Sequence, residues 1–223
     1  MPVIKSIHIN NSDYQKVYEF MQNYTATRTA EDFDYIITTE HKPIYTMGPN
    51  SDSSDIISKT DHIPYFKTNR GGKITFHGPG QLVIYTLIDL KRLGIKVHEL
   101  IDTFEYSMLD FLKSIDLQGN LDPKNRGIYI NNDKIASLGI RVSRGCTYHG
   151  IAINVNTDLN NFSKINPCGL SNIKMQNLEA FSQLSINKVK MLYLKIFIKR
   201  IETIIGQPID ICTYSDKILK RMS

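Results

Sequence analysis

Apolar side chains recur every three or four positions in three parts of the chain, which predicts three amphipathic helices. The first is predicted to begin just after Ser12, and the second to run from Val97 to Ile115. The third begins near Ser185, a residue type that caps helix N-termini, and ends near Gly206. Each helix is expected to pack its apolar face against a sheet.

Strand patterns fill most of the remaining sequence. Strands are predicted at Tyr35–Thr39 and at Leu82–Leu90, and the second is almost continuously apolar, as in a strand covered on both faces. The segments GIYI and KIASLGIRV flank Asn131-Asn132-Asp133, which is a hairpin signal, and another strand covers residues 146–156. We therefore predict an α/β (α+β) fold with a mixed, largely antiparallel central sheet flanked by helices. No linker divides residues 1–223, so a single domain is predicted.

The composition is that of a globular protein with a sizeable core, because 41% of the 223 residues are hydrophobic and 22% are charged. No apolar run is long enough to cross a bilayer, and the first residues lack the apolar core of a signal peptide, so a cytoplasmic location without membrane association is predicted. The net charge of +5 is spread along the chain and suits either a solvated surface or an acidic protein partner. No motif indicates nucleic-acid binding.

The three cysteines form neither a disulfide framework nor a CxxC metal site. Cys168 lies in Asn-Pro-Cys-Gly, between a residue of fixed φ and one without a side chain, a turn that can present sulfur to a substrate. Such a cysteine is compatible with a nucleophile and with a buried structural residue. Cys146 and Cys212 lack this setting and are interpreted as small core residues.

Lys134 is the candidate partner of this thiol. Strict alternation along KIASLGIRV gives it the same phase as Ala136, Leu138, Ile140 and Val142, so it is expected to face the apolar side. A buried amine is costly unless it is paired or deprotonated, and a thiolate would pair it. The alternative is an exposed lysine at the end of the hairpin, and the pattern alone leaves both readings open.

Two of the six histidines stand at strand positions where they can face inward. His77 precedes Gly-Pro-Gly, and His149 shares the phase of Ile151 and Ile153. Either can orient a substrate or serve as a hydrogen-bonded core residue. The other four histidines carry no comparable signal, and no spacing of histidine or cysteine indicates a metal site. The glycines between Gly71 and Gly80 match no phosphate-binding loop, so no nucleotide site is predicted.

Together these segments resemble the octanoyltransferase family, the lipoyl(octanoyl) transferases of lipoate biosynthesis, over about Asp34 to Phe181. Four blocks occur in the family's order: EHKPIYTMG, RGGKITFHGPGQLVIYTLIDLKR, KIASLGIR and RGCTYHGIAINVNTDLNNFSKINPCG. One departure is Gln176-Asn177-Leu178, where the family usually has a Thr-Ser-Leu-like stretch.

The resemblance implies the fold of biotin and lipoate protein ligases. It implies that Cys168 takes an octanoyl group from octanoyl-acyl carrier protein as a thioester, with Lys134 as its partner, and passes it to a lysine of a lipoyl domain. Such domains belong to 2-oxoacid dehydrogenases and the glycine cleavage H protein. No cofactor is required, because a thioester is already activated. The residues implied to bind substrate, together with His149 from the strand pattern, are Arg70, Gly71, Gly72, Lys73, Ile74, Thr75, Phe76, His77, Ser137, Leu138, Gly139, His149, Gly150, Ile151 and Ala152.

Two other functions use the same scaffold. An ATP-dependent lipoate or biotin ligase would need a nucleotide site and no Cys168. A binding module without catalysis would hold an acyl chain or a lipoyl domain in the same pocket.

Overall fold

The computed structural model describes residues 1–60, 62–123, 125–167 and 173–213. Within these ranges the main sheet has eight strands in the order β11-β1-β2-β6-β10-β9-β8-β7. Strand β1 runs parallel to β2 and β11, and every other pairing in this sheet is antiparallel. The prediction of a mixed, largely antiparallel sheet is therefore confirmed. The strands are β1 (Val3–Ser12), β2 (Asp34–His41), β6 (Gln81–Leu87), β7 (Gly119–Leu121), β8 (Ile128–Ile130), β9 (Asp133–Ser143), β10 (Cys146–Asn154) and β11 (Asp210–Thr213).

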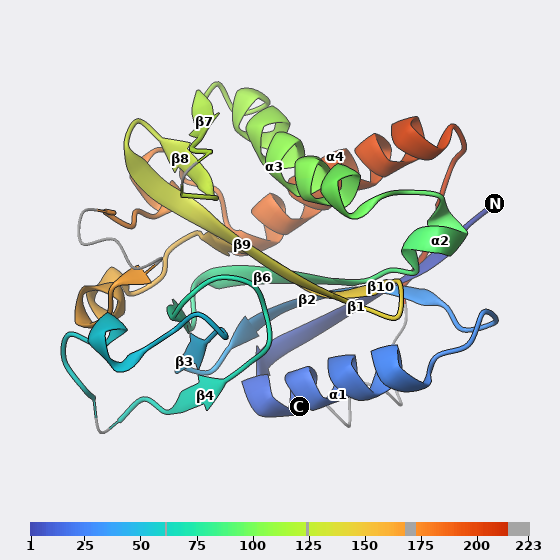
Figure 1. The fold of residues 1–223 in the computed structure, drawn as a ribbon. Helices are drawn as coiled ribbons and strands as arrows, with labels where there is room; N and C mark the ends of the chain where they lie inside the picture. Colours follow the sequence, from blue (N-terminus) through green and yellow to red (C-terminus); the bar gives the residue numbers. More distant parts are fainter. Residues whose placement is uncertain (61, 124, 168–172, 214–223) are drawn as a thin grey trace.

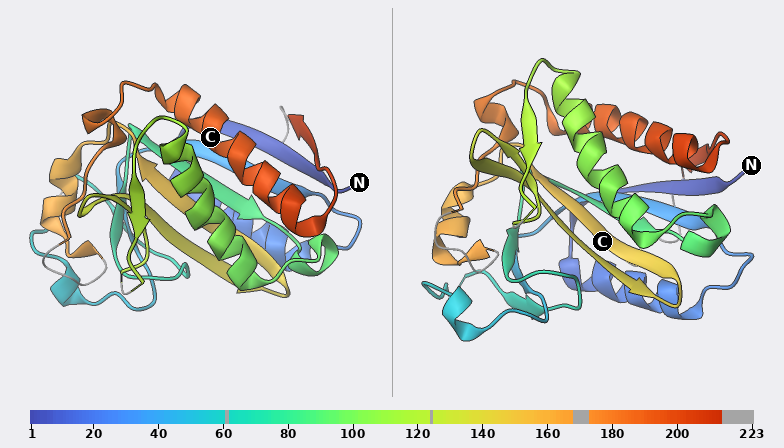
Figure 2. Two further views of the ribbon diagram at one scale, coloured as in Figure 1. Left: turned by 90° about the horizontal axis from the view of Figure 1, so that it is seen from above. Right: turned by 45° about the horizontal axis from the view of Figure 1, so that its top comes forward.

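Helices cover both faces of this sheet. In Figure 1, α3 (Val97–Lys113) and α4 (Ile186–Ile205) lie on one face and α1 (Tyr14–Thr27) on the other. Figure 2 shows α3 and α4 side by side across the strands. The start of α1 is fixed by Asp13, whose carboxylate accepts a hydrogen bond from the Lys16 N–H at 3.2 Å. The Ser185 hydroxyl caps α4 in the same way, and Gly206 ends it in a left-handed conformation, as predicted.

A second sheet lies beside the main one and helps to enclose the site. Its order is β4-β3-β5, formed by β3 (Ile44–Met47), β4 (Tyr65–Lys67) and β5 (Thr75–His77). It packs around Tyr45, Phe76 and Phe162, the last of which comes from the 3₁₀ helix η2 (Leu159–Lys164). Two shorter 3₁₀ turns are η1 (Ser53–Asp55) and η4 (Leu178–Ala180).

The two faces of the main sheet bury different kinds of side chain. Under α3 and α4 the core is mostly aliphatic, with Phe104 and Phe197 between the two helices. Under α1 it is rich in tyrosine, including Tyr14, Tyr85 and Tyr148. Phenol groups can bury their rings and still form hydrogen bonds, so this face can accommodate polar groups at depth.

Two sequence predictions need correction. The strand predicted at Leu82–Leu90 ends at Leu87, because the Asp89 carboxylate accepts from the Arg92 N–H and starts the short helix α2 (Leu90–Leu93). Cys212 was interpreted as a core residue but is exposed on the edge strand β11, whereas Cys146 is buried as expected. No helix in the described ranges has the length and hydropathy needed to cross a membrane.

Candidate active site

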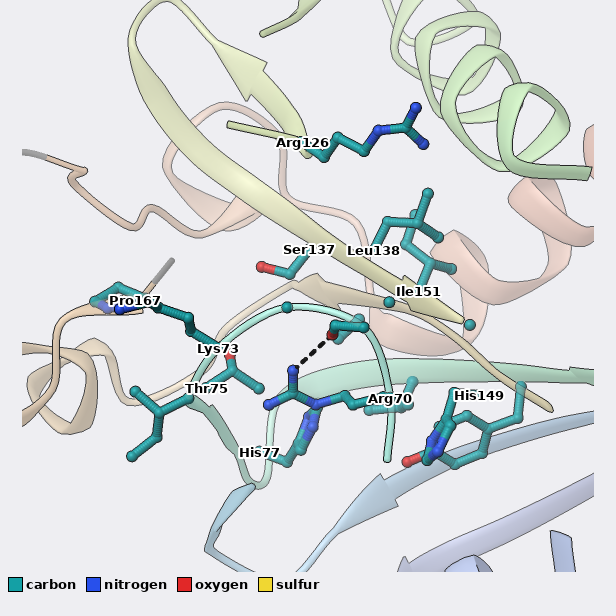
Figure 3. A pocket seen from close by; sticks show the side chains of 18 of the residues that line it. Arg70, Lys73, Thr75, His77, Arg126, Ser137, Leu138, His149, Ile151 and Pro167 are labelled. Carbon is teal, nitrogen blue, oxygen red and sulfur yellow. Dashed lines mark hydrogen bonds between the residues drawn. The ribbon is translucent and has the colours of Figure 1, made fainter. Parts of the chain in front are cut away.

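A cavity of about 70 Å³ lies between the main sheet and the segment from Arg70 to Thr75 (Figure 3). Fifteen residues predicted from the sequence line it, namely Arg70, Gly71, Gly72, Lys73, Ile74, Thr75, His77, Lys134, Ser137, Leu138, Gly139, His149, Gly150, Ile151 and Ala152. Tyr14, Val83, Tyr85, Arg126 and Pro167 also line it and were not predicted. Phe76 does not line it, because alternation along β5 turns its ring away from His77 and onto Phe162.

Small residues of β9 and β10, beside Val83 and Tyr85 of β6, form the floor of the cavity. Ala152 in β10 pairs with Ser137 in β9 and with Val83 in β6. The adjacent row pairs Gly150 with Gly139 and with Tyr85.

The segment from Arg70 to Thr75 forms the opposite wall of the cavity. A methyl group on Gly139 would lie 2.9 Å from the Gly71 carbonyl oxygen, so this segment approaches the floor as closely as glycine permits. The result is a narrow slot suited to an extended apolar chain.

Lys134 is only 1% exposed and lines this slot. Its Nζ donates a hydrogen bond to the Arg126 carbonyl oxygen at 2.7 Å and lies 5.7 Å from the centre of the Tyr129 ring. Its backbone is fixed from outside the strand as well, because its N–H donates to the Lys174 carbonyl and its own carbonyl accepts from the Gln176 N–H. The alternative of an exposed lysine at the hairpin end is therefore wrong.

Lys134 is buried as expected, but it does not lie on the same face as Ala136. The pairing of β8 with β9 shifts register between Ala136 and Lys134, so Ile135 is an extra residue on β9. Ile135 and Ala136 both belong to the core under α3 and α4. Lys134 consequently joins Ser137 and Gly139 at the cavity instead of sharing the face of Ala136. The extra residue in β9 therefore turns the Lys134 amine toward the slot.

Cys168 lies outside the described residues. The residue before it, Pro167, is buried and lines the same cavity as Lys134. The approach to Pro167 is anchored by the Asn166 N–H, which donates to the Asp55 carbonyl oxygen at 2.7 Å. The residue that precedes the predicted nucleophile in the sequence is therefore part of the lining of the slot.

The altered stretch Gln176-Asn177-Leu178 lies next to Lys134. The Asn177 side chain accepts from the Thr157 N–H and donates to the Thr157 carbonyl, at 3.0 and 2.9 Å. Leu178 is fully buried in the core under α3 and α4. The residues that depart from the family pattern are therefore well hydrogen-bonded and packed in this chain.

His149 reaches the cavity through an unusual backbone conformation. A regular β10 would point it to the face of Ile151 and Ile153, but its φ of 65° turns it to the side of α1, where its ring packs on Tyr148 and Tyr18. Its Nε2 lies 3.2 Å from the Asn69 side-chain oxygen, so Nε2 carries the proton. Its Nδ1 has no hydrogen-bond partner among the described residues.

Three buried histidines are held neutral on this side of the sheet. Burial lowers the pKa of His41, His77 and His149 to about 3, and the charge of Arg70 adds to the effect on the last two. His41 was passed over in the sequence, yet its ring is fully buried between the Ser12 and Tyr85 hydroxyls. Its position at the end of β2 gave no sign of this contact.

Arg70 ties the cavity wall to the second sheet. Its guanidinium is buried and donates to the Thr46 hydroxyl and carbonyl and to the Gly71 carbonyl. Figure 3 marks a hydrogen bond of the Arg70 guanidinium with a dashed line. The described residues contain no group of three or more His, Cys, Asp or Glu side chains arranged to hold a metal ion.

Known proteins share this sequence and this fold. Residues 13–198 match the family model of the lipoyl protein ligase A/B catalytic domain. An octanoyltransferase of Shewanella sp. (strain W3-18-1) is 43% identical over 173 residues, which cover 78% of this chain and 79% of the relative.

Among solved structures, a bi-partite lipoate protein ligase from Thermoplasma acidophilum, studied with its E2 lipoyl domain, matches with a TM-score of 0.74 at 13% identity. The match covers 99% of this chain and 90% of that one. A biotin protein ligase from Aquifex aeolicus in complex with biotin and ATP gives 0.56 at 13% identity, with 93% and 74% covered. These likenesses confirm the predicted fold, and the sequence similarity decides between the families that share it. The chain belongs to the octanoyltransferases, acyltransferases that carry the lipoyl protein ligase A/B catalytic domain.

Proposed function

We propose that this chain moves an octanoyl group from octanoyl-acyl carrier protein to a lysine of a lipoyl domain, through a thioester on Cys168. The observation that carries the proposal is the burial of Lys134 in the same cavity that Pro167 lines. A buried amine in a slot floored by small residues, with the residue before Cys168 in the lining of the same slot, supports a two-step acyl transfer. The relative from Thermoplasma acidophilum, studied with its E2 lipoyl domain, supports lipoyl domains as acceptors.

In the first step the Cys168 thiolate attacks the donor's carbonyl carbon. A new carbon–sulfur bond forms, the donor's carbon–sulfur bond breaks, and the carrier's thiolate leaves and takes a proton from the Lys134 ammonium, which becomes neutral. Exchange of one thioester for another is close to balanced in free energy, so no ATP is needed. A positively charged neighbour such as Lys134 favours the attacking thiolate.

In the second step the acceptor lysine's amine attacks the Cys168 thioester. The amide bond forms, the bond to Cys168 breaks, and the amine's proton passes through Lys134 to the departing sulfur. Amide formation draws the sequence forward. Lipoyl domains of 2-oxoacid dehydrogenases and the glycine cleavage H protein are the proposed acceptors.

Intact-mass spectrometry after mixing with octanoyl-acyl carrier protein tests the intermediate. The wild-type protein should gain one octanoyl group that hydroxylamine removes, and Cys168→Ala should gain none. Cys212→Ala is the matched control, because Cys212 is an exposed thiol outside the cavity and its loss should leave labelling intact. An unlabelled wild-type protein would favour a binding module without catalysis.

Lys134→Ala tests the acid/base role. General acid–base catalysis contributes about 10²- to 10⁴-fold, so transfer to a lipoyl domain should fall by that order while the protein remains folded. Near-normal transfer would remove Lys134 from the mechanism. Product formed from ATP and free octanoate without carrier protein would favour the ligase alternative.

A further inference from the structure

Gly127, the residue just before β8, lies directly against the side chain of Lys134. A methyl group on Gly127 would lie 2.2 Å from Lys134 Cε and 2.9 Å from Lys134 Nζ. It would also lie 2.8 Å from the Ala136 carbonyl oxygen. Gly127 has a φ of 154°, which side-chain-bearing residues rarely adopt. Any larger residue here therefore meets the amine-bearing end of the lysine first.

The lysine backbone cannot move to relieve such a contact. It is paired with β8 through Tyr129, and hydrogen bonds to Lys174 and Gln176 hold its other edge. The part that can yield is the flexible end of the side chain. Its Nζ would then leave its place beside the Arg126 carbonyl, the residue next to Gly127.

We infer that Gly127 is a positioning residue, which fixes the reactive amine by leaving space for Lys134 Cε while the Arg126 carbonyl holds Nζ. This inference rests on the proposed function of Lys134. The extra residue at Ile135 turns the lysine into the slot, and Gly127 determines how far across the slot its amine lies. Gly127 thereby sets the geometry of proton transfer without itself lining the slot.

The expected size of the effect follows from the distances. Restoring an ordinary contact from 2.2 Å requires Cε to move by about 1 Å, and misplacement by about 1 Å can cost on the order of 10²-fold in rate. Gly127→Ala should therefore lower kcat for transfer by about 10- to 100-fold. KM should change little, because the floor of the slot and the wall formed by residues 70–75 stay in place.

Gly145→Ala is the matched control. Gly145 lies in the turn between β9 and β10, has a φ of 78°, and has open space where a methyl group would lie. The control also replaces a glycine of positive φ, but without a contact to Lys134. Its kcat should remain within about two-fold of the wild-type value, as expected for a turn position away from any special contact.

A double-mutant cycle with Lys134→Ala separates positioning from a structural role. If Gly127 acts through the lysine, Gly127→Ala should reduce the residual rate of Lys134→Ala by less than about two-fold. Shortening the lysine should also raise the melting temperature of Gly127→Ala, and this readout remains available if the single variant folds poorly.

Three results would overturn the inference. The first is a Gly127→Ala kcat close to that of the wild type while Lys134→Ala is impaired. The second is an equal rate loss in both backgrounds. The third is a fold defect that Lys134→Ala does not relieve, which would assign the effect to the Ala136 carbonyl or to backbone strain at Gly127. An unimpaired Lys134→Ala would instead refute the proposed function of the lysine, and the inference with it.

Discussion

Replacing Ala152 with valine tests whether the floor of the slot determines the length of acyl chain that the protein accepts. Ala152 lies in the centre of the floor, between Ser137 on β9 and Val83 on β6. Valine suits a strand and adds two methyl groups that point into the cavity. The described space of about 70 Å³ is smaller than the roughly 150 Å³ cavity that admits benzene, so the slot has little slack. Added methyl groups therefore compete directly with substrate carbons.

The magnitude follows from the burial of methylene groups. Each buried methylene contributes about 0.8 kcal/mol, so exclusion of two costs about 1.6 kcal/mol. Since about 1.4 kcal/mol corresponds to ten-fold, the ratio of kcat/KM for octanoyl over hexanoyl donors should fall by about 15-fold. A shorter chain that does not reach the obstruction should react at its wild-type rate.

The assay measures kcat/KM for butanoyl, hexanoyl, octanoyl and decanoyl carrier proteins. Val83→Ala is the complementary change, because it opens the floor beside Ala152 and should favour decanoyl. The exchange Ala152→Val with Val83→Ala keeps the volume of the row and should restore the octanoyl preference. If Ala152→Val folds and leaves the chain-length profile unchanged, the slot does not determine the chain-length preference.

Two further predictions concern stability. The folded pKa of about 3 for His41, His77 and His149 lies below the unfolded value of about 6.5, so the unfolded chain binds protons first as the pH falls. The stabilising contribution of these histidines should be fully present above about pH 6.5 and should be lost as the pH falls towards 3. At pH 5 the free energy of unfolding should be lower by about 2 kcal/mol for each histidine. Melting temperatures that stay level between pH 7 and 5 would contradict this. Asp34→Ala should lower the free energy of unfolding, measured in urea, by about 3–5 kcal/mol, because it leaves the buried Arg28 guanidinium without its carboxylate partner at 2.7 Å. A loss under about 1 kcal/mol would show that stability does not depend on this ion pair.

Much of the fold could be predicted because long elements carry their own signals. Helices α3 and α4 have caps and apolar stripes, and their predicted starts agree with the structure within a residue. Strand β1 was not predicted, although it occupies an interior position in the sheet between β11 and β2. Its sequence, VIKSIHINNS, mixes polar residues with isoleucine, and only its partners, which are far away in sequence, make it a strand. Pairing between distant segments is the information that a local pattern lacks.

The site shows why local alternation fails where polar groups must be buried. Lys134 and His149 both occupy phases that would place them under α3 and α4, in an aliphatic core with few polar partners. The extra residue at Ile135 and the left-handed backbone of His149 turn both side chains to the slot. Motif similarity could still identify them, because a motif preserves residue types even where it does not reveal the backbone. Regular strands would have buried these groups without partners at a cost of several kcal/mol, so irregularity in β9 and β10 is the physical requirement for combining a stable sheet with a reactive pocket.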